Sequence, residues 1–146
     1  MKLSTKGRYG VRLMFDLASH YGINGPITLK DVARRQEISE KYLWHLIPPL
    51  KSAGLVNSVR GSRGGYVLSR PPKEINLLEI AEALEGQMCL VECAERPSMC
   101  SRSAACIARE VWAEASAKML EYLADFTLEM MVERQRSKQE KLSYAI

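Results

Sequence analysis

The sequence lacks several features that define whole classes of protein. No apolar run approaches the roughly 20 residues that a membrane-spanning helix needs, and the first ten residues, MKLSTKGRYG, contain no apolar stretch after their charges. We therefore predict no membrane segment and no signal peptide, and expect a cytoplasmic protein. Histidine is scarce, with two in 146 residues, and no phosphate loop of the Gly-Lys-Ser/Thr type is present. These absences argue against an enzyme, and no small-molecule substrate is expected.

Glycine and proline are absent from residue 103 to residue 136. Apolar residues in this stretch follow a near-heptad course: Ile107, Val111, Ala115, Met119, Tyr122, Phe126 and Met130. The pattern predicts one helix over 103–136, which at 1.5 Å per residue would be about 45 Å long. A domain of this size cannot cover such a helix, so we predict a homodimer formed through it. The alternative is that the helix folds back on its own domain. The polar tail, 137–146, is expected to fray.

Acidic residues are scarce in the first half of the chain and abundant in the second. Residues 1–70 hold 12 Lys and Arg against 4 Asp and Glu, whereas residues 71–146 hold 9 against 13. A basic first half suits a polyanionic partner such as nucleic acid, and an acidic second half does not.

Three short helices are predicted in the basic half. The first runs from about Lys6 to Tyr21, and the turn after it contains Gly22, Asn24, Gly25 and Pro26. Thr28 and Ser39 are expected to cap the second and third helices. Two short helices joined by a tight turn form the helix-turn-helix pattern. Pro48 and Pro49 are expected to interrupt the third helix, because each removes a backbone donor.

A hairpin with a basic tip follows the helix-turn-helix pattern. Strands are predicted at Leu55–Val59 and at Tyr66–Ser69, joined by the glycine-rich loop Arg60–Gly65. Asn76 then caps a helix at Leu77–Glu85, and Gly86 stops it. The predicted fold is mainly α with a small β-hairpin wing: a winged helix-turn-helix domain plus a long dimerisation helix. We divide the chain into a DNA-binding domain (1–86), a cysteine segment (87–106), the long helix (103–136) and the tail (137–146).

The winged helix predicts binding to double-stranded operator DNA. Tyr42, Trp44 and His45 of the third helix are expected to face the major groove, and the arginines of the loop suit a narrow minor groove. The predicted DNA-binding residues are Thr28, Ser39, Lys41, Tyr42, Trp44, His45, Arg60, Ser62, Arg63 and Gly64.

All four cysteines fall within the cysteine segment, at Cys89, Cys93, Cys100 and Cys106. Thiolates are soft ligands that suit zinc, copper(I) and iron–sulfur clusters. Zinc sites usually pair their cysteines closely at both ends, but here only Cys89 and Cys93 are that close, and the longer gaps suit a loop around a cluster. A metal-free thiol switch, a structural disulfide and an inert buried Cys89 are the alternatives.

Three segments resemble one family of bacterial regulators. These are MKLSTKGRYGVRLM, ISEKYLWHLIPPLKSAGLVNSVRGSRGGYVLS and VECAERPSMCSRSAACIAREVW, and they are similar to the winged-helix regulators of the Rrf2 family. The resemblance implies a homodimer that binds DNA through its third helix and wing. It also implies a two-iron two-sulfur or four-iron four-sulfur cluster that tunes operator affinity, and we expect the two-iron two-sulfur type here. The cysteines that match the ligands of the family are Cys93, Cys100 and Cys106.

The sequence departs from its family at the fourth ligand. One branch of the family carries a histidine three residues after its third cysteine, where this chain has Arg109, and another uses an acidic residue that aligns with Arg8. Arginine cannot ligate. Cys89 is the first candidate by its chemistry; Glu92, Glu110 or a residue of the second subunit are the others.

The third helix also departs from the family. Family members commonly carry Glu-Gln after Tyr-Leu, and this chain carries Trp44-His45, so base readout at these positions is expected to differ. Three functions follow. The leading one is a DNA-binding regulator controlled by an iron–sulfur cluster, and the second is a regulator that senses thiol oxidation or a partner protein without metal. The third, a small iron–sulfur electron carrier or enzyme, would require a chain that binds no DNA.

Overall fold

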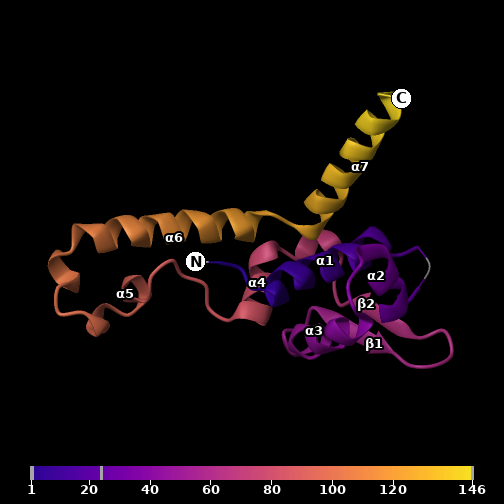
Figure 1. Ribbon diagram of the computed structural model, residues 1–146, viewed down its shortest axis with the longest axis horizontal. Coiled ribbons are helices and arrows are strands. Elements are labelled where there is room, and N and C mark those ends of the chain that lie inside the picture. The colour runs from indigo at the N-terminus through magenta and orange to yellow at the C-terminus, as the bar shows by residue number, and fades with distance from the viewer. Residues whose placement is uncertain (1, 24, 146) are drawn as a thin grey trace.

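The computed structural model describes residues 2–23 and 25–145, so Asn24 of the predicted turn and Ile146 of the predicted tail lie outside the described residues. The chain is mainly helical with one antiparallel hairpin, and its elements form a compact body from which α6 and α7 project (Figure 1). The elements are α1 (Thr5–Ser19), α2 (Leu29–Gln36), α3 (Glu40–Ser52), β1 (Val56–Val59), β2 (Gly65–Leu68), η1 (Pro72–Glu74), α4 (Leu77–Glu85), α5 (Glu92–Glu95), η2 (Pro97–Met99), η3 (Ser103–Ala105), α6 (Ile107–Asp125) and α7 (Leu128–Tyr144).

The hydrophobic core lies between α1, α2, α3 and α4. Apolar side chains that recur every three or four residues put one face of each helix into this core, and those with almost no exposed surface include Leu13, Met14, Leu17, Val32, Leu43, Leu46, Leu50 and Ile80. The caps predicted at Thr28 and Ser39 are confirmed, because their side chains accept hydrogen bonds from the first-turn amides of α2 and α3. Ser4 caps α1 in the same way.

Helix α3 runs without a break through Pro48 and Pro49, so the predicted interruption is wrong. The carbonyls that lose their partners are those of Trp44 and His45, one turn back. Both residues are exposed, so the loss of these two hydrogen bonds leaves no unpaired polar group in the core. The buried leucines on the opposite face keep the helix continuous.

The predicted hairpin is confirmed to within a residue at each end. Strands β1 and β2 pair in register from Val56 opposite Leu68 to Val59 opposite Gly65. A further antiparallel bridge ties β2 to the segment before α2, where Ile27 and Tyr66 exchange two backbone hydrogen bonds of 2.9 and 2.8 Å. A side chain at Gly65 would collide with the backbone of Ile27, so only glycine permits this approach. The wing is therefore fixed to the helix-turn-helix unit at its base.

Helix α4 holds the start of α1. The carboxylate of Glu85, the last residue of α4, accepts hydrogen bonds from the amides of Ser4 and Gly7, both at 3.0 Å, and from the Ser4 hydroxyl. A negative charge at a helix N-terminus is favourable because it faces unpaired amides and the positive end of the helix dipole. The predicted Asn76 cap is confirmed, as is the end of α4 at Gly86.

The single long helix predicted over 103–136 is wrong, because the chain bends between α6 and α7 (Figure 1). Phe126 is extended there, and its carbonyl accepts from the Leu77 amide at 2.9 Å. The Leu128 amide donates to Ile75, also at 2.9 Å, and the Leu128 side chain is fully buried in the core. Burial of these apolar side chains compensates for the helical hydrogen bonds lost at the bend.

Helix α7 continues where a frayed tail was expected. Thr127 caps it by accepting from the Met130 amide, and the helix extends to Tyr144. Helix α7 packs against α1. This contact agrees with the alternative that this part of the chain folds back on its own domain. Within residues 2–23 and 25–145, no helix combines the length and the apolar character that crossing a bilayer demands.

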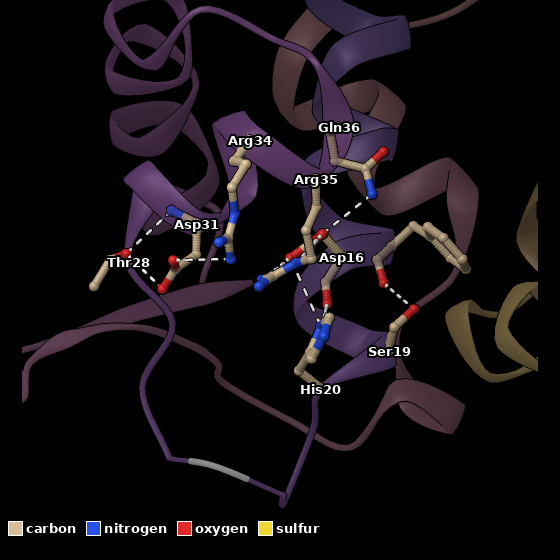
Figure 2. A network of polar contacts seen from close by, with 9 residues as sticks. Asp16, Ser19, His20, Thr28, Asp31, Arg34, Arg35 and Gln36 are labelled. Carbon is tan, nitrogen blue, oxygen red and sulfur yellow. Dashed lines mark hydrogen bonds and ion pairs between the residues drawn. The ribbon is translucent and has the colours of Figure 1, made fainter.

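A buried carboxylate joins α1 to α2 (Figure 2). Asp16 is 1% exposed and accepts two hydrogen bonds from the guanidinium of Arg35, at 3.0 and 2.7 Å, and one from the Gln36 amide group at 3.1 Å. His20 Nδ1 lies 3.8 Å from the same carboxylate. The hydrogen bond to Asp16 and the negative charges of Asp16 and Asp31 raise the pKa of Arg35, against the opposing effect of burial. This network sets the position of the first helix of the helix-turn-helix unit on α1.

Candidate nucleic-acid interface and cysteine segment

A groove of about 370 Å³ lies between the helix-turn-helix unit and the wing. Its lining combines small, polar and basic side chains with two aromatic rings: Thr28, Leu29, Lys30, Glu40, Trp44, Ser58, Val59, Arg60, Gly61, Gly64, Gly65 and Tyr66. The groove brings together residues that are up to 38 positions apart in the chain, from Thr28 to Tyr66. The fold therefore assembles one continuous surface from α2, α3 and the hairpin.

Trp44 lines this groove from α3. Its side chain is 54% exposed on α3, and its ring meets that of Tyr66 edge-on, with centroids 6.3 Å apart and planes at 82°. Aromatic pairs of this geometry are favourable beyond the area they bury. The pair connects the exposed face of α3 to the wing.

The other predicted residues of the helix-turn-helix unit divide into two groups. Lys41 and His45 are exposed on α3, beside Trp44. Tyr42, by contrast, is half-buried, and its ring packs edge-on against Tyr9 of α1 at 5.6 Å. The hydroxyls of Thr28 and Ser39 accept hydrogen bonds as helix caps. These two residues therefore act by orienting the first turns of α2 and α3.

The tip of the wing presents its arginines to solvent. Arg60, Ser62 and Arg63 are exposed, and the turn is closed by a hydrogen bond of 3.0 Å from the Gly64 amide to the Gly61 carbonyl. A side chain at Gly64 would meet the Val59 carbonyl, so glycine keeps the tip thin. Two guanidinium groups on a narrow projection suit insertion into a minor groove.

Sequence reasoning missed several residues that line the groove, among them Lys30, Ser58 and Tyr66. Lys30 lies in the first turn of α2, two residues after the Thr28 cap. This position beside a predicted DNA-binding residue could have indicated it. Ser58 is held by the Lys51 ammonium group, which donates to its hydroxyl at 2.9 Å. Tyr66 could be found only through its contact with Trp44, because the register of the hairpin decides which face it occupies.

The cysteine segment runs outward beside α6, and α5 lies near the far end of that helix (Figure 1). All four cysteines are free: Cys100 is exposed, and Cys89, Cys93 and Cys106 are half-buried. Cys106 is the N-cap residue of α6. The thiols are therefore accessible, and none of them is held in a disulfide.

Two contacts fix the first part of the cysteine segment to α6. The Leu90 amide donates to the hydroxyl of Ser116 at 3.1 Å, and Arg109 Nε donates to the Cys93 carbonyl at 2.8 Å. Ser116 follows Cys106 by ten residues, which is about 15 Å along the helix axis. Cys89, next to Leu90, thus lies well away from Cys106 along α6.

The four thiols suit a soft metal or an iron–sulfur cluster by their chemistry. In the part of the chain that the structure describes, however, no three Cys, His, Asp or Glu side chains are gathered closely enough to bind one metal ion. The cysteine segment would have to close around such a group, with exposed Cys100 lying between two short 3₁₀ turns.

Helix α6 exposes an apolar face. Of the 19 residues of α6, one, Ser116, is buried. The exposed apolar residues, each about half exposed or more, are Ile107, Val111, Trp112 and Tyr122. A large exposed apolar patch on a soluble chain usually marks an interface. This face and the spacing of its residues suit a second helix packed along α6.

Comparison with known proteins places this architecture. The sequence profile of the Rrf2 family, described as an iron-dependent transcriptional regulator, matches residues 3–134. The protein rrf2 of Nitratidesulfovibrio vulgaris strain Hildenborough is 43% identical over 128 residues, which cover 88% of this chain and 85% of that protein. The match therefore spans the wing, the cysteine segment and the start of α7.

Two solved structures share the fold over most of their length. CymR, the global cysteine regulator of B. subtilis, superposes with a TM-score of 0.78 at 40% identity and covers 92% of this chain and 98% of its own. The T. potens IscR superposes with a TM-score of 0.77, also at 40% identity, over 95% of this chain and 91% of its own. The winged helix-turn-helix fold and the long C-terminal helices are thus shared with transcriptional regulators. The chain belongs to the Rrf2 family of DNA-binding transcriptional regulators.

Proposed function

We propose that this regulator is a cytoplasmic homodimer whose affinity for operator DNA is controlled by an iron–sulfur cluster held by the cysteine segment. The observation that carries the proposal is the placement of Cys93, Cys100 and Cys106: free, accessible thiols at the far end of α6, separate from the groove at α3 and the wing. Trp44, His45 and Lys41 would meet the major groove, and Arg60 and Arg63 the minor groove. Ser39, Thr28 and Tyr42 would support them.

The ligands would be Cys93, Cys100 and Cys106, and the cluster most simply a two-iron two-sulfur cluster. Such a cluster supplies a centre that exchanges single electrons. Cys93 and Cys106 are attached to α6, whereas Cys100 lies on the outer part of the segment. Binding a cluster through all three would move the outer part of the segment and change the surface beside the first turn of α6. Cys89 could serve as the fourth ligand only if the hydrogen bond between Leu90 and Ser116 were broken, and this loss would weaken its binding.

Purification under anaerobic conditions tests the cluster directly. We expect a brown protein with near-equal iron and acid-labile sulfide, and an operator affinity that changes when the cluster is removed with a chelator. Cys100→Ala should reduce bound iron and sulfide at least tenfold, because a cluster of this kind requires its thiolates. The matched control is Cys89→Ala, which should retain most of the iron if Cys89 stays beside Ser116. Full iron content in Cys100→Ala would contradict the ligand assignment.

The second candidate is a metal-free regulator that senses thiol oxidation or a partner protein. The similarity to CymR favours it, together with the absence of an assembled three-ligand group among the described residues. The same purification separates the two functions. A colourless protein without iron or sulfide, grown with ample iron, whose DNA binding still responds to oxidants, would support the second.

We further propose that two copies pair through the apolar face of α6. Val111→Asp should convert the dimer to a monomer, because the charge would be buried between the helices at a cost of several kcal/mol. Sedimentation velocity at micromolar concentration measures this. The matched control is Ala117→Asp, which places the same charge on the exposed face that carries Glu114 and Glu121. An unchanged dimer in Val111→Asp would refute this interface.

A further inference from the structure

Helix α5 is too short to be stable by its own hydrogen bonds. It spans the four residues Glu92–Glu95, and within it the Ala94 amide donates to Val91 and the Arg96 amide to Glu92. An isolated turn of helix does not persist in water, because nucleation fixes several residues for one or two hydrogen bonds. The structure shows no side-chain cap at its N-terminus. Something outside α5 must therefore hold it in shape.

Arg109 supplies that support from α6. Its Nε donates to the Cys93 carbonyl at 2.8 Å, and its terminal nitrogen lies 3.4 Å from the Ala94 carbonyl. These carbonyls belong to the last turn of α5, where helical partners are lacking. A planar guanidinium presents several donors in a fixed geometry and is suited to contact two neighbouring acceptors.

The position of Arg109 is otherwise unfavourable. It lies in the first turn of α6, three residues after the N-cap residue Cys106. Positive charges are destabilising at that end of a helix, which carries the positive end of the dipole. The side chain of Arg109 is half-buried and contacts the carbonyls of α5. These contacts, rather than the stability of α6, account for an arginine at this position.

We propose that Arg109 is a positioning residue that caps α5 from α6 and thereby holds Cys93 near Cys106. Two cysteines of the segment are then placed in advance: Cys106 as the N-cap of α6, and Cys93 through its own carbonyl. Cys100 is left to complete the set. The proposal rests on the proposed function for the identity of the bound group, but the capping of α5 is a property of the metal-free chain.

Hydrogen exchange on the metal-free, full-length protein tests the cap. Hydrogen bonds from a charged donor change a local opening equilibrium by about tenfold or more. We expect Arg109→Ala to accelerate exchange at the Ala94 and Arg96 amides by at least tenfold, and to increase the rate at which Cys93 is alkylated. Arg109→Lys keeps the charge but not the paired donors, so its exchange rates should lie between those of the wild type and those of Arg109→Ala. The matched control, Arg102→Ala, removes an exposed arginine of the same segment and should match the wild type.

The outcomes decide between capping and simple charge. Exchange in Arg109→Ala within twofold of the wild type would overturn the cap. Equal acceleration in Arg102→Ala and Arg109→Ala would also overturn it, because a general charge effect would then explain both.

Iron loading tests the consequence for the cysteines. When iron and sulfide are limiting, Arg109→Ala should take up less than half the cluster of the wild type and lose it several times faster, with all four thiols still titratable. Wild-type-like loading by a variant that has lost the α5 protection would refute the positioning role. A wild type that takes up no iron and sulfide would refute the proposed function alone, since the exchange result would still decide whether Arg109 caps α5.

Discussion

Replacing Asp16 with asparagine should lower the free energy of unfolding by about 3 kcal/mol. The carboxylate is almost fully buried, and removing its charge leaves the Arg35 guanidinium, 30% exposed, facing an amide group that offers one acceptor instead of two. For a chain of this length the loss corresponds to a fall in melting temperature of roughly 6–12 °C. Thermal and urea unfolding at one fixed protein concentration would measure it, because the stability of a dimer depends on concentration.

The matched control is Asp31→Asn, in the same helix-turn-helix unit. Asp31 also pairs with an arginine, but both side chains of the Asp31–Arg34 pair are largely exposed, at 46% and 74%. Exposed pairs of this kind contribute less than about 1 kcal/mol. A double-mutant cycle with Arg35→Ala should show that most of the Asp16 effect depends on Arg35. Equal losses in Asp16→Asn and Asp31→Asn would show that burial of the network does not govern its contribution.

Removing both arginines of the wing tip should weaken operator binding by about 100-fold and reduce the salt dependence of binding. Arg60→Ala with Arg63→Ala deletes two exposed positive charges from the projection that is proposed to enter the minor groove. Each lost phosphate contact lowers the slope of log K against log salt by about 0.9, so the pair should lower it by about 2. Fluorescence anisotropy over a range of salt concentrations measures both quantities.

A control with the same change of net charge separates wing contacts from general attraction. Lys138→Ala with Lys141→Ala removes two exposed lysines from α7, away from the groove and from the apolar face of α6. This variant should bind with nearly the affinity and slope of the wild type. If the wing variant keeps its full salt slope, or if both double variants lose affinity equally, the arginines do not contact DNA.

Local signals in the sequence were sufficient for most of the winged-helix part of the fold, the exception being the interruption expected at Pro48 and Pro49. The caps at Thr28, Ser39 and Asn76 are short-range chemistry between a side chain and the next turn, which no distant contact has to complete. The same holds for the hairpin, whose glycine-rich tip sets its position. The sequence analysis also expected Trp44 on the outer face of the third helix, and this residue is exposed on α3.

Predictions failed where tertiary contacts override local propensity. The residues at the bend, Asp125 to Leu128, carry no glycine or proline, and the bend exists because Phe126 and Leu128 pair with the backbone on either side of Asn76. The partner of Tyr42 could not be predicted either: its ring packs edge-on against Tyr9, 33 residues back along the chain. The contact between Arg109 and α5 is equally non-local.

The burial of Leu128 has a consequence for how the two halves of the molecule unfold. This side chain begins α7, yet it is fully enclosed in the core of the winged helix, with its amide bonded to Ile75. The operator-reading half and the arm thus form one cooperative unit rather than two modules joined by a linker. A disturbance that frees the first turn of α7 withdraws a core leucine from beneath the DNA-binding half, so the integrity of that half is inseparable from the arm.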